Sequence, residues 1–142
     1  MRPLLFSIFL LLCHPAWGAN CAEVAATLNR DLNPKVDAAE LAEVLASLNR
    51  KGQLPAKFIS KREARAAGWT PGSNLWQALP GRSIGGDRFG NYEKNLPPGR
   101  YSEADLDYQG GKRGTKRIVF SDSRRFVTVD HYRTFREAPP CR

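Results

Sequence analysis

The stretch YSEADLDY, residues 101–108, alternates apolar and polar side chains, which is the pattern of a β-strand with one buried face. On such a strand Glu103 and Asp105 point to the same side. The other side is apolar and carries Ala104, Leu106 and Tyr108. The segment therefore predicts a sheet that covers a hydrophobic core and turns two carboxylates away from it.

Two further strands are predicted downstream. RIVFS, residues 117–121, repeats the alternation, with Ile118 on the apolar side and Arg117 on the other. RFVTVDHYRTF, residues 125–135, extends the same pattern and would place four side chains on one face: Val127, Val129, His131 and Arg133. The second half of the chain thus predicts an antiparallel sheet.

Three helical segments precede these strands, and each opens with a side chain that can cap a helix. They are NCAEVAATLNRDL from Asn20, DAAELAEVLASLNRKG from Asp37 and SKREARAAG from Ser60, each with a glutamate three residues after the cap. The second has apolar residues at helical spacing and a glycine stop: Leu41, Val44, Leu45, Leu48 and Gly52. Trp69 and Trp76 would pack between helices and sheet.

Helices followed by antiparallel strands predict an α+β domain, with the N-terminal helices packed on one face of a C-terminal antiparallel β-sheet. Residues 1–18 read as a signal peptide, because Arg2 precedes the apolar run 4–12 and the small-residue stretch PAWGA follows. We expect cleavage after Gly18 and export of one domain, residues 19–142, without stable membrane association.

Two cysteines remain in that mature chain, Cys21 and Cys141, near its opposite ends. In an exported protein such an even pair predicts a disulfide, whereas two free thiols are the alternative. The chain has 22 Lys and Arg against 14 Asp and Glu, and loss of Arg2 lowers the formal charge from +8 to +7. This balance favours nucleic acid, anionic membranes or acidic proteins as partners.

Glu103, Arg117 and His131 could converge on the sheet face that the helices leave open. A carboxylate and an imidazole on either side of a substrate form a general base and general acid pair, and an arginine would stabilise developing negative charge. The alternatives are structural: a hydrogen-bonding histidine, a Glu103 paired with Arg113 or Arg117, and a basic surface loop. With one histidine and two bonded cysteines left, neither a metal nor a cofactor is expected.

Several motifs occur in an order that is specific. They are GQLP (52–55), FISKREARAAGW (58–69), PGRSIGGDRFGN (80–91), YSEADLDY (101–108), KRIVFS (116–121) and DHYRTF (130–135). Together they resemble barnase and its relatives, the small secreted bacterial guanyl-preferring ribonucleases. The resemblance covers about residues 36–135, so that only the first helix and the terminal cysteines fall outside it.

The resemblance implies a microbial ribonuclease fold and a role for each matching residue. Glu103 would be the general base that takes the proton of the ribose 2′-hydroxyl, and His131 the general acid that protonates the departing 5′-oxygen. Asp105 would orient one of the cations. The remaining matches are contacts to the phosphate: Lys61, Arg113, Arg117 and Tyr132.

The family's guanine-recognition loop matches Phe89, Gly90, Asn91, Tyr92 and Glu93. In relatives its backbone amides bind guanine O6 while the glutamate accepts from N1 and N2, so Glu93 would set the base preference. Asp87 and the preceding Gly85–Gly86 resemble the turn that holds this loop. Three departures stand out: Tyr92 replaces an arginine, Lys112 replaces an aromatic residue, and SDSRRF (121–126) is one residue shorter and lacks an aromatic residue.

These matches imply an exported, metal-independent endoribonuclease that cleaves single-stranded RNA after guanosine, through a 2′,3′-cyclic phosphate that is then hydrolysed to a 3′-phosphate. The alternative is a non-enzymatic basic nucleic-acid-binding protein on the same fold. We expect a monomer, periplasmic or extracellular. The resemblance also implies a small acidic cytoplasmic inhibitor, similar to barstar, as a partner before export.

Overall fold

The computed structural model describes residues 2–4 and 19–142, so most of the predicted signal peptide, with its cleavage site, lies outside the described residues. Four helices are found in the described part: α1 (Cys21–Asp31), α2 (Ala38–Lys51), α3 (Lys61–Ala66) and α4 (Leu75–Ala78). The strands are β1 (Phe58–Ile59), β2 (Ser83–Phe89), β3 (Tyr101–Asp105), β4 (Arg117–Phe120), β5 (Arg125–Thr128) and β6 (Arg136–Ala138). None of these helices is long and apolar enough to cross a membrane.

The six strands form one sheet in the order β1-β2-β3-β4-β5-β6, so each strand pairs with its neighbour in sequence. The pairs from β2 to β6 are antiparallel, as predicted. β1 runs parallel to β2, with Phe58 opposite Ser83, because α3 and α4 form the crossover between these two strands. The α+β prediction is confirmed, with one parallel pair added at the edge.

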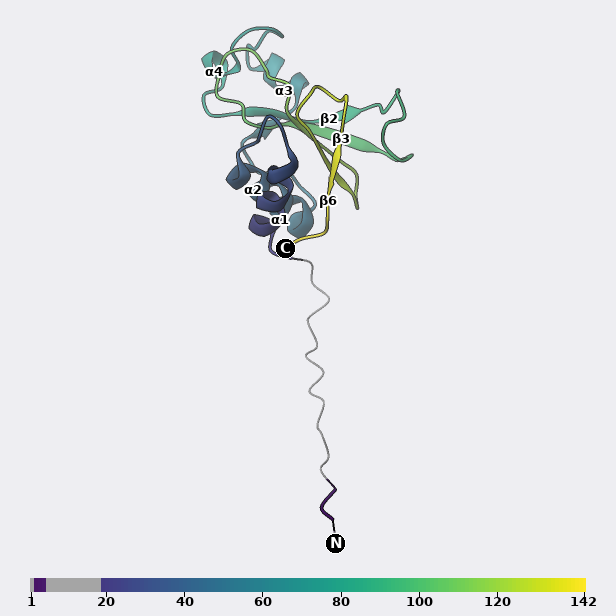
Figure 1. The fold of residues 1–142 in the computed structure, drawn as a ribbon. Helices are drawn as coiled ribbons and strands as arrows, with labels where there is room; N and C mark the ends of the chain where they lie inside the picture. The colour runs from purple at the N-terminus through teal and green to yellow at the C-terminus, as the bar shows by residue number, and fades with distance from the viewer. Residues whose placement is uncertain (1, 5–18) are drawn as a thin grey trace.

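The main core lies between one face of this sheet and the helices α1 and α2 (Figure 1). Leu41, Val44, Leu45 and Leu48 are all buried, which confirms the helical spacing predicted for α2. The sheet contributes Ala104, Ile118 and Val127 from three adjacent strands. The side of β3 and β4 that the sequence predicted to be apolar is therefore the side that the helices cover.

A second cluster packs α3 and α4 against β1 and β2 and contains Trp69 and Trp76, as predicted. Tyr108 belongs to this cluster, and its ring meets that of Trp76 edge to face. The predicted strand to Tyr108 is thus too long, because β3 ends at Asp105. The Tyr108 hydroxyl donates to the Gly111 carbonyl at 2.6 Å and accepts from the Leu75 amide at 2.9 Å, which anchors the loop after β3.

All three predicted caps are present, since the side chains of Asn20, Asp37 and Ser60 accept from backbone amides in the first turns of their helices. Glu40 does not complete the capping box predicted with Asp37. Its carboxylate instead lies 2.6 Å from Lys57 Nζ and accepts from the Asp107 amide at 2.7 Å. Glu40 therefore ties α2 to the segment before β1 and to the loop after β3.

The two ends of the domain are joined by a disulfide between Cys21 and Cys141, whose Cα atoms are 4.9 Å apart. The Cys21 amide donates to the Arg142 carbonyl, and the Arg142 amide donates to the Ala19 carbonyl. Figure 1 shows the C-terminus beside the start of α1. The predicted disulfide is confirmed, and it closes a loop that contains every helix and strand of the described fold.

Candidate active site

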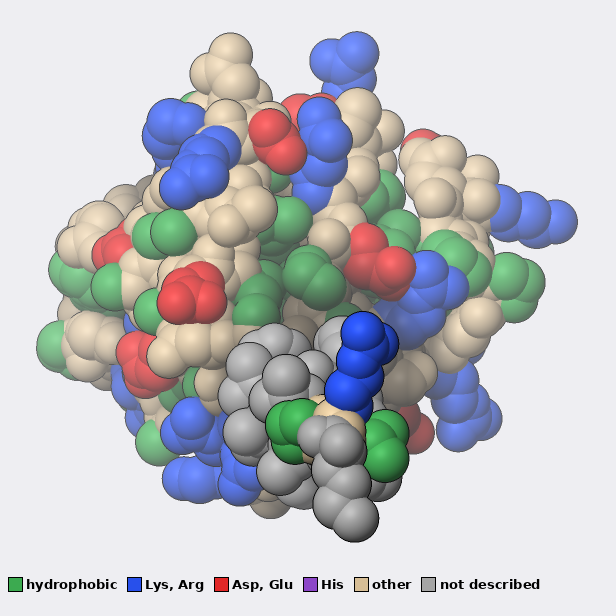
Figure 2. All heavy atoms as spheres, turned by 60° about the horizontal axis from the view of Figure 1, so that its bottom comes forward, with side chains coloured by type: hydrophobic (Ala, Val, Ile, Leu, Met, Phe, Trp, Pro, Cys, Tyr) green, Lys and Arg blue, Asp and Glu red, His purple; other side chains and the backbone are tan. Residues whose placement is uncertain are grey.

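Glu103 and Arg117 lie on the sheet face opposite α1 and α2. Glu103 of β3 pairs with Val119 of β4, and Val119 belongs to a third cluster together with Tyr101 and Phe126. Residues directly opposite in a ladder share a face, so Glu103 lies on the side of this third cluster. Figure 2 looks toward the end of the domain where α1 and α2 lie, and no described histidine appears on that surface.

Glu103 is buried, with 9% of the residue's area exposed. One of its oxygens accepts a 2.9 Å hydrogen bond from the Tyr132 hydroxyl. Burial, and next the negative charge of Glu103, raise the pKa of Tyr132 to about 12. Tyr132 therefore stays protonated at neutral pH and remains a donor to Glu103.

Asp105 holds two arginines beside Glu103. Its oxygens accept two 2.7 Å hydrogen bonds from Arg113 Nε and Nη2, a bidentate arrangement. These bonds, opposed by burial, raise the pKa of Arg113 above its ordinary value. Arg117 Nε lies 2.9 Å from Asp105 Oδ1 without the alignment of a hydrogen bond, while its Nη1 donates to the Gly114 and Lys116 carbonyls.

The guanidinium of Arg117 also lies 6.0 Å from the centre of the Tyr132 ring. Arg117 is buried, with 3% of its area exposed, and shares one carboxylate with Arg113. Asp105 and Glu103 together balance the formal charges of Arg113 and Arg117. Both guanidinium groups are nevertheless bound to Asp105 rather than to Glu103.

His131 does not continue β5, which corrects the strand predicted through residue 135. β5 ends at Thr128, and both His131 and Tyr132 adopt positive φ, at 53° and 74°. Asp130 causes this change of direction. Its side chain accepts from the Thr128 hydroxyl at 2.9 Å and from the Thr134 amide at 2.9 Å, which builds a turn in place of a ladder.

The same turn brings His131 next to the other site residues. The His131 amide donates to the Thr115 carbonyl at 3.1 Å, and the Thr115 hydroxyl donates to the Val129 carbonyl at 2.9 Å, so the loop that carries Arg113 supports the loop that carries His131. The rings of His131 and Tyr132 have centroids 4.7 Å apart. The exposed imidazole thus lies beside the residue that contacts Glu103.

The segment Phe89 to Glu93 lines a small cavity of about 160 Å³ next to this cluster. Asn91 has φ 49° and shapes the loop, because its amide side chain donates to the Leu96 carbonyl at 2.9 Å and accepts from the Leu96 amide at 3.1 Å. The ring of Phe89 stacks on that of Tyr132, with centroids 5.1 Å apart. Tyr92 is 92% exposed at the cavity rim.

Asp87 joins α3 to the sheet next to Glu103. Its carboxylate accepts from the amide of Lys61, the first residue of α3, at 3.0 Å, and Asp87 pairs with Glu103 across the β2–β3 ladder. Gly85 has to be glycine, because a Cβ there would lie 2.6 Å from the Phe58 ring and 2.8 Å from the Ala104 Cβ. The register shift after Gly85 then turns Asp87 toward α3.

The structure thus brings Glu103, Arg113, Arg117, Tyr132 and His131 into one cluster and places the predicted recognition loop beside it. Sequence reasoning missed the turn built by Asp130, and it missed Asn95 and Phe135, which also line the cavity. Asp130 within a strand pattern, with Thr134 four residues later, is a signal for such a turn. Among the described residues no group of three His, Cys, Asp or Glu is placed to hold a metal ion.

Comparison with known proteins gives consistent matches. A model of the ribonuclease family matches residues 42–139. A ribonuclease from Heyndrickxia coagulans is 45% identical over 93 residues, which cover 62% of this chain and 85% of that protein. Ribonucleases from Bacillus intermedius and Bacillus pumilus are also 45% identical over 93 residues, which span 57% of their length, or just over half of each.

Proposed function

The chain belongs to the ribonuclease family, and from this premise we propose that it is an exported endoribonuclease that cleaves single-stranded RNA after guanosine. The observation that carries the proposal is the buried Glu103 carboxylate, held by Tyr132 and flanked by two arginines that share one counter-ion. A carboxylate base, an exposed imidazole and neighbouring arginines are what transfer of a phosphoryl group needs at neutral pH.

In the first step Glu103 takes the proton of the ribose 2′-hydroxyl while that oxygen attacks the adjacent phosphorus. The bond from phosphorus to the 5′-oxygen of the next nucleotide breaks, and His131 donates a proton to that oxygen. In the second step His131 takes a proton from water, the water oxygen opens the 2′,3′-cyclic phosphate, and Glu103 returns its proton to the 2′-oxygen. Both groups regain their starting states without a metal or cofactor.

The surrounding residues would bind the phosphate and orient Glu103. Arg113 and Arg117 would bind the nonbridging phosphate oxygens, whose charge rises in the transition state. Lys61, at the start of α3, would add a further cation. Tyr132 keeps one oxygen of Glu103 occupied, which leaves the other oxygen to act as the base.

Base preference is assigned to the cavity lined by Phe89, Asn91, Tyr92 and Glu93. A carboxylate at its rim could accept from both N1 and N2 of guanine, whereas adenine lacks those two donors on the same edge. Tyr92, exposed above Gly90, would stack on the base. We place the mature enzyme outside the cytoplasm as a monomer, and a small acidic inhibitor would protect the cell before export.

The test uses the mature, disulfide-bonded protein on the dinucleotides GpU, ApU and CpU, with and without EDTA, and follows the 2′,3′-cyclic product. We expect EDTA-insensitive cleavage with GpU as the best substrate, and a loss of about a hundredfold or more for Glu103→Gln and His131→Ala. Equal rates on all three would contradict the guanine assignment. Absence of cleavage by folded protein would leave the alternative, a basic nucleic-acid-binding domain.

A further inference from the structure

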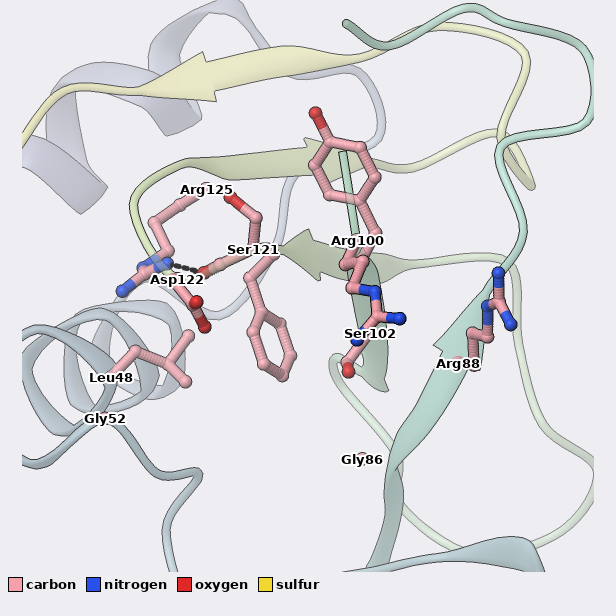
Figure 3. Close-up of a pocket in the computed structure, with 11 residues that line it drawn as sticks. Leu48, Gly52, Gly86, Arg88, Arg100, Ser102, Ser121, Asp122 and Arg125 are labelled. Carbon is pink, nitrogen blue, oxygen red and sulfur yellow. Dashed lines mark hydrogen bonds between the residues drawn. The ribbon is translucent and has the colours of Figure 1, made fainter. Parts of the chain in front are cut away.

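A second hollow, larger than the recognition cavity, lies on the other face of the sheet, where α2 ends. It has a volume of about 480 Å³, which is within the range of small-ligand sites. Figure 3 shows Leu48 of α2, Gly52 just after it and Arg125 on one side of the hollow, and Arg88 and Arg100 on the other. Because α2 stops at Lys51, the sheet beyond it is left uncovered. We call this hollow the arginine groove; its polar lining is Arg88, Arg100, Ser102, Ser121, Asp122 and Arg125.

The register of the sheet fixes which face the groove occupies. Arg88 pairs with Ser102, Ser102 with Phe120, and Phe120 with Arg125, which makes one row across β2 to β5. Phe120 packs against the core under α1 and α2, so the row lies on the helix side, opposite Glu103. Three steps between strands give the row a length of about 14 Å.

Three arginines line the groove against one acidic residue, Asp122. Arg88 and Arg100 are exposed, and neither side chain has a hydrogen-bond or ion-pair partner within the described part of the chain. Arg125 is only 7% exposed. Three acceptors, all neutral, bind its guanidinium: Asn49 Oδ1 and the Ser121 and Arg124 carbonyls. The one carboxylate in the lining, Asp122, forms no ion pair with any described residue.

Arg125 carries its positive charge in a buried position. Burial lowers the pKa of Arg125, and the negative charge of Asp122 opposes that shift only in part. A buried guanidinium whose hydrogen-bond partners are all neutral is a costly charge, and an anion that reaches it would stabilise it. With three arginines against one aspartate, the groove is suited to an anion that enters from solvent.

The groove adjoins the proposed site through a shared hairpin. Arg88 precedes Phe89 of the recognition loop, and Arg100 precedes Tyr101 of the cluster beneath it. Neighbouring residues in a strand point to opposite faces, so the hairpin presents the recognition cavity on one side and the arginines on the other. A chain that crosses the hairpin could contact both.

We propose that the arginine groove binds a second stretch of the single-stranded RNA substrate, with its phosphates on Arg88, Arg100 and Arg125 and a base against the half-buried Phe120 ring. A cationic groove with an aromatic side chain at its floor is the usual platform for single strands. This inference rests on RNA as the substrate of the proposed function.

The first measurement is binding of a fluorescent, uncleavable oligodeoxynucleotide to Glu103→Gln protein across a salt series. Adding Arg88→Ala and Arg100→Ala should weaken binding about tenfold and lower the salt slope by about 1.4, or 0.7 for each lost phosphate contact. Arg30→Ala with Arg50→Ala is the matched control, because it removes the same charge from exposed ends of α1 and α2. If both double variants lose the same affinity for the oligonucleotide, the proposal that the groove binds RNA is overturned.

The second measurement uses active protein. The groove variant should cleave GpU at the parental rate, since a dinucleotide is too short to cross the hairpin, but should show a higher KM on long single-stranded RNA. If the folded protein is inactive but its oligonucleotide binding still depends on Arg88 and Arg100, the proposed ribonuclease activity is refuted and the proposed binding site in the groove stands. Arginine-dependent binding of inorganic phosphate or of anionic vesicles, with oligonucleotide binding unchanged, would refute the RNA assignment.

Discussion

The hydroxyl of Tyr132 donates a 2.9 Å hydrogen bond to the carboxylate of Glu103, across 29 residues of sequence. Glu103 lies in β3, whereas Tyr132 lies in the turn after β5 that also presents His131. This bond therefore joins the proposed base to the loop of the proposed acid. Movement of that loop would change the environment of both groups together.

Tyr132→Phe should alter stability at alkaline pH. The pKa of Tyr132 rises from 10.0 to about 12 in the fold, so the native state favours the protonated hydroxyl. That contribution is complete below pH 10 and is lost as pH rises toward 12, at a cost of about 2 kcal/mol after allowance for partial exposure. Urea unfolding at several pH values would show a steeper alkaline decline for the parent than for the variant. Parallel curves would argue against the assignment.

Asp105→Asn should be severely destabilising, because it leaves the buried Arg117 and the half-buried Arg113 without their shared counter-charge. Breaking a buried pair in this way costs about 3–5 kcal/mol. Glu137→Gln is the control, since it breaks an equally short contact to Arg124 on the exposed surface and should change the unfolding midpoint little. Similar shifts for both variants would mean that burial of the Asp105 pair is unimportant.

Asp130→Ala should lower kcat for GpU by about tenfold while leaving its KM unchanged, because the turn that holds His131 loses both side-chain hydrogen bonds. Burial opposes ionisation of Asp130, but the combined hydrogen bonds from Thr134 and Thr128 outweigh it and lower its pKa below 3.8. Its stabilising effect is present above pH 3.8 and is lost as pH falls through the lowered value. Asp31→Ala, on the exposed end of α1, provides the matched comparison in acid unfolding.

Tyr92→Ala should leave the unfolding free energy nearly unchanged, because the side chain is 92% exposed. If its ring stacks on guanine, KM for GpU should rise about tenfold, in keeping with about 1–3 kcal/mol for each base–aromatic contact. Glu93→Gln should instead reduce the ratio of GpU to ApU cleavage. Steady-state kinetics on both dinucleotides separate stacking from hydrogen-bond recognition, and unchanged constants in both variants would place the base elsewhere.

Replacing Cys21 and Cys141 together by alanine should lower the unfolding free energy by about 4–5 kcal/mol, since the bond closes a loop of 120 residues. The variant should keep its kcat wherever it is folded, because neither cysteine lies near Glu103 or the recognition loop. Calorimetry with activity at low temperature tests both statements. A variant as stable as the parent would show that the backbone bonds between the ends suffice.

The alternation in β3 and β4 and the three helix caps follow from local rules, and these parts of the fold were predictable from sequence. The end of β5 was not, because the pattern of alternating side chains continues through His131. Only the side chain of Asp130, which binds Thr128 and Thr134, turns the backbone away. Local hydrogen bonds here overrode the periodicity.

In the site, too, local rules predicted some features and missed others. Residue types at Glu103 and His131 suggested an acid and a base, and the resemblance assigned their roles, but the bond between Glu103 and Tyr132 depends on tertiary structure. Glu40 is another example, since a capping position in sequence becomes a tertiary link to Lys57 and Asp107. The arginine groove was unpredictable for a geometric reason: it exists where α2 is shorter than the sheet it covers.

The bond between Cys21 and Cys141 makes the domain a covalent ring that encloses every element from α1 to β6. A protease that cuts an exposed loop, such as residues 92–95, opens that ring into one linear molecule and releases no fragment. The two parts of the nicked sheet then stay at high effective concentration and can re-dock without a bimolecular encounter. If the protein is exported as we propose, a first cut by a protease would therefore leave it in one piece.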